Sequence, residues 1–474
     1  MVEQTRATAN RGESGYRSRV QLTIPLAVEI AAARAAGALS RRAGRGGGTT
    51  LPGKLLWKLD PGAIDRLAAR LPDGSVLVSA TNGKTTTAAM VAEILRPRLE
   101  LAHNRSGANL VSGVASTLLR SGGAELGLFE VDEAALPEVA RRVRPKALLL
   151  GNLFRDQLDR YGELETVAAR WRRAVAELPE THLVLNGDDP QIGDLARAGS
   201  RVFGLDDPRQ ARTGLQHAAD SKYCLRCGTP YDYAAAYVGH LGDYRCPNCG
   251  HARPALDVVA REISLGGLDG ASFTLAATAG ETRVQLALPG LYNVYNALGA
   301  AALALELGVP LGEIVTGLER FSAAFGRFER IAVGDRSVLM LLIKNPAGAN
   351  EVVRTLLDAG SPRVAVVALN DAIADGRDVS WIWDVDFEPL AAGLDTLVAT
   401  GSRAAELALR FAYGGMPRER IEVVPSLEQA LDRGLALTAA GGDLTVLPTY
   451  TAMLALRRTI AGRGHVANYW ESAA

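Results

Sequence analysis

The sequence lacks several features that assign a protein to a class directly. Its 474 residues carry 52 basic and 52 acidic side chains, and this zero net charge argues against general attraction to nucleic acid or to an anionic membrane. No apolar run approaches the length of a membrane span, because the stretch 22–39 contains Glu29 and Arg34. The position of that stretch also speaks against a signal peptide. The six histidines are scattered singly, so paired histidine metal ligands are not expected.

Cysteine is scarce as well. All four cysteines fall within residues 224–249, which favours a metal site over a disulfide framework and makes the cytoplasm the expected compartment. A hydrophobic content of 48% and a charged content of 22% are typical of a well-buried globular protein. The chain is too long for one ordinary core, so two or three domains are expected.

The clearest motif is a phosphate-binding loop. An apolar strand at 76–79 runs into Thr81-Asn-Gly-Lys-Thr-Thr-Thr87, and a helical pattern follows. In that geometry backbone N–H groups and a helix N-terminus converge on phosphate oxygens, Lys84 meets the β- and γ-phosphates, and the Thr85 hydroxyl reaches Mg²⁺. A full Walker A motif has a further glycine where this chain has Val78. A tight turn capped by threonines is the alternative, but such a turn has little use for a lysine.

A group of acidic residues ends the next predicted strand. Glu130-Val-Asp-Glu133 lies at the carboxyl end of an apolar run, where α/β sheets place ligands. Mg²⁺ takes few protein carboxylates besides phosphate oxygens, so one of these side chains is expected to bind the metal. We favour Glu130 over Asp132 because Glu130 continues the apolar run. A solvated acidic turn is the alternative.

The cysteines form two pairs. Cys224-x-x-Cys227 and Cys246-x-x-Cys249 are separated by 18 residues, a spacing typical of four-cysteine zinc sites. Four thiolates complete a tetrahedron and leave no open position, so the predicted Zn²⁺ is structural. A zinc ribbon that binds nucleic acid is the alternative, although this segment contains few basic residues. The tyrosines that could stack on bases are Tyr223, Tyr231, Tyr233 and Tyr244.

Two other acidic segments allow more than one interpretation. Asp188 and Asp189 follow a strand at 182–185 and either contact a nucleotide or cap the next helix. The segment 371–386 combines several aspartates with Trp381 and Trp383. It is either a loop docked on a ligand or partner, or a loop packed by its own tryptophans.

The order of the predicted elements divides the chain. Residues 1–50 form an extension with an amphipathic helix at 21–42. Strands alternating with helices over 51–330 predict an α/β sheet, interrupted by the cysteine-bearing insert at about 220–255. A second, Rossmann-like α/β unit is expected over 331–474, without the glycine pattern of dinucleotide sites.

Taken together, these motifs resemble the Mur ligase superfamily and, within it, the MurT branch, from residue 51 onward. The loop resembles the ATP loop of that superfamily with Ala80 in place of the usual glycine, and Glu130 falls at its Mg²⁺-binding glutamate. Typical members carry a metal-binding histidine where this chain has Gln157, which agrees with the MurT branch and leaves a second Mg²⁺ site open. The further matching segments are 293–296, 326–327, 343–348, 374–384 and the cysteine insert.

The resemblance implies a fold and a reaction. The fold is a Mur ligase-type central ATPase domain with a zinc-ribbon insert, followed by a Rossmann-like α/β domain. The reaction is a ligation in peptidoglycan synthesis. ATP phosphorylates the α-carboxylate of D-glutamate in the stem peptide of lipid II, and ammonia attacks the acyl phosphate to give D-isoglutamine. Lys84 and Mg²⁺ neutralise charge on the transferring group. The implied ATP-binding residues are Thr81, Asn82, Gly83, Lys84, Thr85, Thr86, Asn296 and Arg327.

The resemblance also implies a partner. Hydrolysis of glutamine through a thioester needs a thiolate, and all four cysteines are assigned to zinc. A separate GatD-type glutaminase subunit therefore supplies the ammonia. In the family an aspartate of the C-terminal domain completes that subunit's Cys-His pair, and its place in the motif assigns Asp378, with Asp375 as the nearest competitor. The enzyme is expected in the cytoplasm, at the inner face of the cell membrane, and without a nucleic-acid partner.

Two competing functions remain open at this point. A conventional Mur-type ligase would join an amino acid to a carboxylate without a partner, and it fits poorly with Gln157. A non-enzymatic ATP-binding module with a nucleic-acid ribbon would bind nucleic acid with a steep salt dependence, which the neutral charge balance disfavours.

Overall fold

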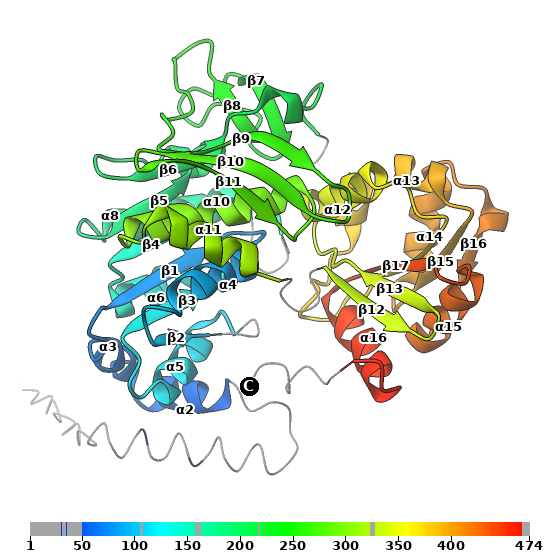
Figure 1. Cartoon of the computed structure of the whole chain (residues 1–474), viewed down its shortest axis with the longest axis horizontal. Coiled ribbons are helices and arrows are strands. Elements are labelled where there is room, and N and C mark those ends of the chain that lie inside the picture. The colour runs from blue at the N-terminus through cyan, green and yellow to red at the C-terminus, as the bar shows by residue number, and fades with distance from the viewer. Residues whose placement is uncertain are drawn as a thin grey trace, which may run out of the picture.

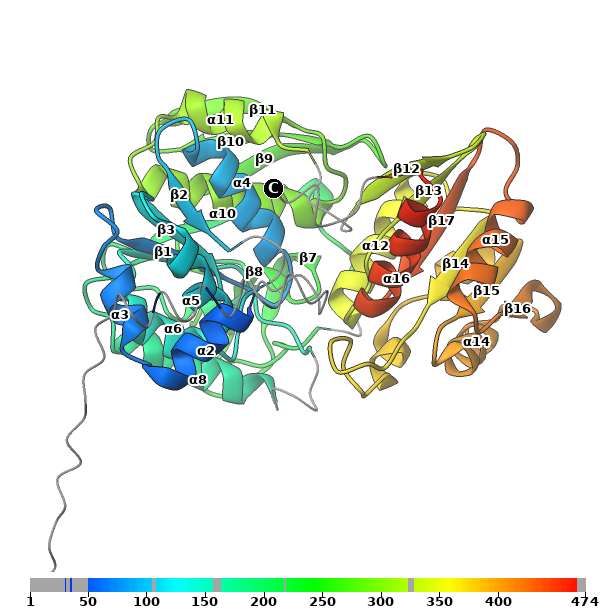
Figure 2. The same cartoon turned by 90° about the horizontal axis from the view of Figure 1, so that it is seen from below.

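Two lobes, each built around one β-sheet, make up the described part of the chain (Figure 1). The computed structural model describes residues 30, 35, 50–104, 108–156, 163–216, 219–322 and 328–466. We call residues 50–322 the first lobe and residues 328–466 the second lobe. Figure 2 shows the lobes side by side, with helix α12 (Pro346–Asp358) of the second lobe on the side that faces the first lobe.

The first lobe holds a nine-stranded sheet in the order β11-β10-β9-β6-β5-β4-β1-β3-β2. The strands run parallel from β2 to β9, and β10 is antiparallel to both of its neighbours, β9 and β11. Val76 and Val78 pack on one face and Leu77 on the other, which explains why β1 reads as a continuous apolar run. The strands are β1 Ser75–Ser79, β2 Leu101–His103, β3 Leu126–Glu130, β4 Ala147–Leu150, β5 His182–Asn186, β6 Arg201–Leu205, β9 Val258–Leu265, β10 Ala271–Ala277 and β11 Gly280–Leu286.

Helices lie on both faces of this sheet, and the central strands β1, β3 and β4 are buried on two sides, whereas residues of β10 and β11 alternate between buried and more exposed positions. One face carries α4 (Lys84–Leu95), α10 (Leu291–Glu306) and α11 (Leu311–Arg320). The other face carries α2 (Leu51–Leu59), α3 (Ala63–Ala68), α5 (Val111–Arg120), α6 (Leu136–Val143) and α8 (Leu164–Ala176). The short helices α9 (Pro190–Gly193) and η1 (Pro208–Gln210) follow β5 and β6.

The cysteine-bearing insert lies between β6 and β9. Its strands β7 (Asp232–Val238) and β8 (Leu241–Arg245) form an antiparallel hairpin outside the main sheet. One cysteine pair precedes the hairpin and the other follows it. The four cysteines therefore gather at the open end of the hairpin, away from its turn.

The second lobe holds a six-stranded sheet in the order β12-β13-β17-β14-β15-β16, parallel except for the β12–β13 hairpin. Helices α12, α13 (Glu388–Gly393) and α14 (Ala404–Tyr413) pack on one face, and α15 (Leu427–Leu437) and α16 (Tyr450–Gly462) on the other. Short turns η2 (Ser380–Asp384) and η3 (Arg418–Arg420) complete the lobe. The strands are β12 Glu329–Val333, β13 Arg336–Met340, β14 Val364–Ala368, β15 Thr396–Thr400, β16 Ile421–Val423 and β17 Asp443–Pro448.

The predicted α/β alternation over two sheets is confirmed. The proposed division at 330 and 331 stays a prediction; β12, which begins at Glu329, already pairs in the second sheet. The helix predicted at 21–42 lies almost wholly outside the described residues. Within the ranges given above, no helix has the length and apolar character needed to cross a membrane.

Candidate active site between the lobes

The phosphate loop joins the end of β1 to the start of α4. Gly83, the residue before α4, has a φ of 84°, a left-handed conformation that favours glycine. A Cβ atom at this position would come within 1.9 Å of the Asn296 Oδ1 atom of α10. Both backbone conformation and space therefore require glycine here. The backbone of the loop therefore lies directly against the Asn296 side chain of α10, with no space for a side chain at position 83.

Lys84 lies under the loop in a buried ion pair. Its Nζ atom donates to the carbonyl oxygens of Ala80 (2.9 Å) and Thr81 (3.3 Å) and pairs with the Glu133 Oε2 atom at 3.0 Å. Burial opposes the charge of Lys84, but Glu133 and three further carboxylates outweigh burial and raise the pKa of the amine. Lys84 is therefore held charged at the base of the loop. The pairing with Glu133 was not predicted from the sequence.

Thr85 and Glu130 come together as expected for a metal site. The Thr85 hydroxyl donates to the Glu130 Oε1 atom at 2.9 Å, and Glu130 is 2% exposed. The backbone of Glu130 is fixed by Asn104, whose Oδ1 atom accepts from the Glu130 N–H and whose Nδ2 atom donates to the Glu130 carbonyl. Asp132 instead accepts a hydrogen bond from the backbone N–H of Ala134. Hydroxyl and carboxylate oxygens are hard donors of the kind Mg²⁺ binds.

The second lobe reaches into this site through two consecutive residues. The Lys344 Nζ atom donates to the Thr81 carbonyl at 2.9 Å and pairs with the Asp156 Oδ2 atom at 2.6 Å. The amides of Asn345 and Asn82 exchange two hydrogen bonds, at 3.0 and 3.2 Å. The phosphate loop is thus held from both lobes. The sequence drew attention to the segment 343–348 only through the family resemblance.

Asp156 is the buried partner of Lys344. Its side chain is 6% exposed, and burial raises its pKa even though Lys344 is adjacent. One of its oxygens, Oδ1, has no hydrogen-bond partner among the described residues. The next residue, Gln157, lies outside the described residues, and so does Arg327. The predictions made for those two positions remain predictions.

A cleft lies between the lobes beside the phosphate loop, and its empty space of about 940 Å³ includes part of the open solvent at its mouth. Asn296 joins the cleft to the loop, because its Oδ1 atom accepts from the Thr87 hydroxyl and its Nδ2 atom donates to Asn293. Thr86 is buried against the same space. Mostly apolar walls with a few polar groups suit a base and a ribose next to a phosphate site. The polar lining includes Asn82, Thr86, Asn152, Asn293, Asn296, Lys344 and Glu351.

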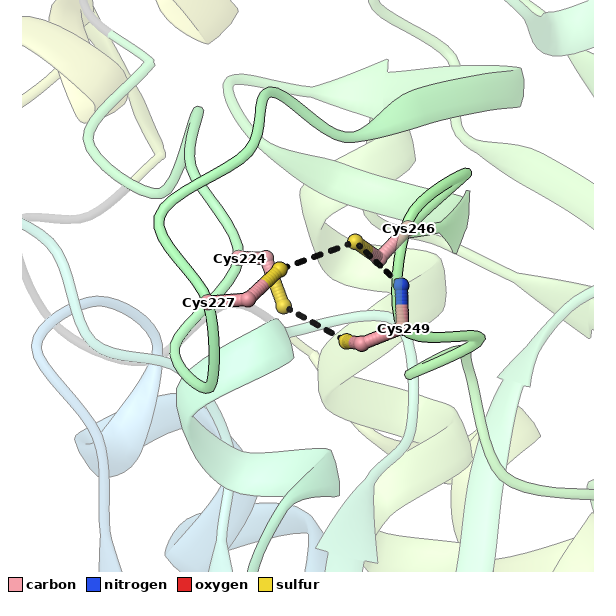
Figure 3. A group of neighbouring side chains, drawn as sticks. All are labelled: Cys224, Cys227, Cys246 and Cys249. Atoms are coloured by element: carbon pink, nitrogen blue, oxygen red, sulfur yellow. Dashed lines mark hydrogen bonds between the residues drawn. The ribbon is translucent and has the colours of Figure 1, made fainter.

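The four cysteines meet in one cluster (Figure 3). The Cys224 and Cys249 sulfur atoms are 3.5 Å apart and those of Cys227 and Cys246 are 3.4 Å apart, while all four sulfurs lie within 4.8 Å of one another. Four sulfurs around a zinc ion at about 2.3 Å would be about 3.8 Å from one another, so the cluster has the size of a tetrahedral metal site. The separations are too long for disulfide bonds.

The tyrosines of the insert pack beside this cluster rather than facing solvent. Tyr231 and Tyr244 are buried, and Tyr233 is half-buried beside them, with its hydroxyl bonded to the Ser221 and His240 carbonyls. Tyr223 is exposed. Three of the four side chains offered for base stacking therefore belong to the small core of the insert, which disfavours the nucleic-acid alternative.

The structure assigns Asp188 and Asp189 to structural roles. Asp189 caps α9 by accepting from the backbone N–H of Gln191, and it also accepts from Leu153 N–H. Asp188 accepts from the Tyr295 hydroxyl at 2.6 Å and pairs with Arg253 at 3.0 Å. The capping alternative holds for Asp189, and Asp188 supports a residue that lines the cleft.

The two candidate aspartates of the segment 371–386 differ in exposure. Asp375 is 5% exposed, and its carboxylate accepts from the backbone N–H and the hydroxyl of Thr451. Asp378 is exposed and accepts from the Ser380 N–H at 2.9 Å, and the bonds to Ser380 lower the pKa of Asp378. The Asp375 carboxylate therefore bonds within the second lobe, whereas the Asp378 carboxylate lies at the surface.

Comparisons with known proteins agree with these motifs. The MurT ligase C-terminal family matches residues 342–453, and the Mur ligase middle domain matches residues 78–304. The chain is 34% identical, over 88% of its length and 93% of the relative's, to the lipid II isoglutaminyl synthase (glutamine-hydrolyzing) subunit MurT of Streptococcus pneumoniae R6.

Solved structures show the same fold. A pseudomurein peptide ligase type C from Methanothermus fervidus aligns with a TM-score of 0.68 at 22% identity, over 84% of this chain and 80% of that one. The MurF ligase of Thermotoga maritima in complex with ADP aligns with a TM-score of 0.60 at 15% identity, over 87% and 85% of the two chains. The Mur ligase-type fold expected from the sequence is thereby confirmed.

Proposed function

We propose a function from one premise: this chain belongs to the MurT family of Mur ligases. It is the synthetase subunit of a lipid II isoglutaminyl synthase and uses ATP to amidate the α-carboxylate of D-glutamate in the stem peptide of lipid II, giving D-isoglutamine. The amido donor is glutamine, hydrolysed by a GatD-type glutaminase subunit. The observation that carries this proposal is that one chain combines a phosphate loop held by both lobes with four cysteines that are all gathered in one cluster.

The first chemical step is phosphoryl transfer. An oxygen of the substrate carboxylate attacks the γ-phosphorus of ATP, and the bond between that phosphorus and the ADP oxygen breaks. Lys84, fixed at the base of the loop, offsets the negative charge that spreads over the phosphoryl oxygens. Lys344 of the second lobe contacts the same loop through the Thr81 carbonyl and adds a second positive charge there.

The second step forms the amide. The nitrogen of ammonia attacks the carbonyl carbon of the acyl phosphate, and the bond from that carbon to the phosphate oxygen breaks. One ammonia proton ends on the released phosphate. Free ammonium salts would support this step without the partner, since ammonia in equilibrium with ammonium reaches the same intermediate.

Two metals fit the donor atoms present. Thr85 and Glu130 would hold Mg²⁺, which neutralises phosphate charge when bound. The four thiols would hold Zn²⁺ in a closed, structural site. Since the cluster uses every cysteine of the chain, glutamine hydrolysis through a thioester requires a nucleophile from the partner.

The partner would dock where Asp378 is exposed. Ile373, Trp383 of η2 and Tyr413 of α14 are exposed, and the ring centroids of Trp383 and Tyr413 lie 5.7 Å apart. Exposed aromatic side chains grouped in this way are typical of protein interfaces. Asp378 would orient the histidine of the partner's Cys-His pair, as the third member of a triad does. With lipid II as the substrate, the complex would act in the cytoplasm at the inner face of the membrane.

The experiment that tests the proposal is amidation of lipid II with ATP, with glutamine or ammonium chloride as nitrogen source, with and without the co-expressed glutaminase. Product from ammonium with this chain alone, and from glutamine only with the partner, is the expected result. An amino acid consumed in place of ammonia would instead identify a conventional Mur-type ligase. No ATP turnover with any of these substrates would reject both.

A further inference from the structure

The β7–β8 hairpin connects the cysteine cluster to the cleft between the lobes. The cluster closes the open end of the hairpin, because Cys224 and Cys227 precede β7 and Cys246 and Cys249 follow β8 (Figure 3). At the other end, Val238 closes β7 and Leu241 opens β8, and both side chains line the cleft. The hairpin thus has its metal-binding residues at one end and cleft-lining residues at the other.

The turn of the hairpin is fitted closely to the phosphate-loop side of the cleft. A Cβ atom at Gly239 would come within 2.7 Å of the ring of Phe154, which also lines the cleft. His240 is fully buried, its ring centroid is 4.6 Å from that of Phe154, and its Nε2 atom is 3.5 Å from Asp189. Because there is little free space, a displacement of the turn would move Phe154 and the wall of the cleft with it.

The hairpin also supports the helix of the second lobe that borders the cleft. Arg354 of α12 donates to the Tyr237 carbonyl at 3.4 Å. Arg212, whose backbone N–H bonds to the Ala236 carbonyl, pairs with Glu351 of α12 at 2.8 Å. Glu351 is itself a lining residue of the cleft. The hairpin therefore contacts both lobes at the place where they enclose the cleft.

A third connection runs through Asp188. The segment after the second cysteine pair is tied to this buried carboxylate by Arg253, at 3.0 Å. The Gly242 N–H of β8 donates to the Asp188 carbonyl at 2.9 Å. Tyr295, which lines the cleft from α10, donates its hydroxyl to the same carboxylate at 2.6 Å. One side chain thus ties the insert to a residue of the cleft wall.

We propose that the turn of the β7–β8 hairpin is a wall of the nucleotide pocket, and that the metal-bound cysteine cluster keeps this wall in place. The inference rests on the proposed nucleotide site and deepens it, because it assigns the insert a role in nucleotide affinity beyond stability. Val238 and Leu241 would contact the base or ribose of the nucleotide. The cysteines would act through the hairpin as positioning residues, without touching the ligand.

The test measures the affinity of the full chain for ADP with magnesium by calorimetry. One sample is as purified, one has had its metal removed by a chelator under reducing conditions, with free thiols counted to confirm removal, and one has been reloaded with zinc. We expect the dissociation constant to rise at least tenfold on removal and to recover on reloading, while circular dichroism shows that the fold persists. A metal-free, folded chain that binds ADP within twofold of the untreated one would overturn the proposal.

A variant series keeps the proposal testable if the metal-free chain unfolds. Leu241→Ala should raise the dissociation constant for ADP at least fivefold while the zinc content stays unchanged. Leu241→Ile, which keeps a side chain of similar volume, should retain most of the affinity of the unaltered chain. Tyr223→Ala removes an exposed side chain of the same insert outside the cleft and should leave the affinity unchanged. Equal affinities for Leu241→Ala and Tyr223→Ala would overturn the proposal. Absence of ADP binding by the unaltered chain would instead reject the nucleotide site itself.

Discussion

Lys344 of the second lobe donates a hydrogen bond to the carbonyl oxygen of Thr81 in the phosphate loop, across 263 residues of sequence. The same ammonium group pairs with Asp156, whose side chain is almost fully buried. The phosphate loop belongs to the first lobe, but the second lobe supplies one of the positive charges beside it. We therefore expect the proposed reaction to depend on contact between the lobes.

We predict that Lys344→Met lowers the rate of ATP-dependent amidation by about 10- to 100-fold, because a charge-assisted contact near the transferring phosphoryl group is worth roughly 1.4–2.7 kcal/mol in the transition state. The measurement is the initial rate with ammonium chloride at saturating ATP. Lys58→Met, on the exposed surface of α2, is the matched control. A Lys344→Met rate within twofold of the unaltered chain would show that this amine only bridges the lobes.

The ion pair between Lys84 and Glu133 leads to a prediction about pH. Burial works against the charge of Glu133, but Lys84 and Lys344 outweigh it and lower the carboxyl pKa. A lowered pKa gives stability that is present above the unfolded value, near 4.5, and is lost as the pH falls through the folded value. In Lys84→Met, burial becomes the larger influence on Glu133 and raises its pKa instead of lowering it. The contribution of Glu133 to the stability of the variant then increases as the pH falls.

The expected result is that Lys84→Met abolishes ATP turnover and that its deficit in melting temperature, relative to the unaltered chain, shrinks from pH 7.5 to pH 5. Thermal unfolding at the two pH values measures the deficit. The double variant Lys84→Met/Glu133→Gln serves as the control, because its deficit should not depend on pH through this site. Normal ATP turnover by Lys84→Met would reject the phosphate-loop assignment, and a deficit that grows on acidification would contradict the account of the ion pair.

The parts of this site that could be predicted from the sequence are those with a local signal. Gly83, Lys84 and Thr85 lie in one short loop between an apolar strand and a helix, so their spacing indicates their roles. Glu133 was visible as one of several acidic residues, but its pairing depends on how the chain turns after β3. The contact from Lys344 depends on how two lobes meet, and no local pattern encodes that arrangement.

The cysteine cluster predicts a further change in stability. Cys227→Ser removes one of the four sulfur ligands, and since structural zinc contributes directly to folding, the variant should lose several kcal/mol of stability and most of its bound zinc. Thermal unfolding and metal analysis measure the two effects. Tyr223→Ala, which removes an exposed side chain of the same insert outside the ligand set, is the control. An unchanged melting temperature in Cys227→Ser would indicate an insert that is dispensable for folding.

The last prediction separates the two aspartates of the segment 371–386. Asp378 is exposed beside the proposed docking surface, so Asp378→Asn should lower glutamine-dependent amidation by roughly 10³-fold or more, as loss of a triad carboxylate does, while reaction with ammonium chloride stays within twofold. Asp375→Asn should destabilise the chain by about 1–3 kcal/mol, because an amide cannot accept both hydrogen bonds from Thr451. Parallel assays with both nitrogen sources, and thermal unfolding of each variant, measure these effects. Equal loss with glutamine and ammonium in Asp378→Asn would place this residue in the synthetase reaction instead, and a glutamine-specific loss confined to Asp375→Asn would exchange the two assignments.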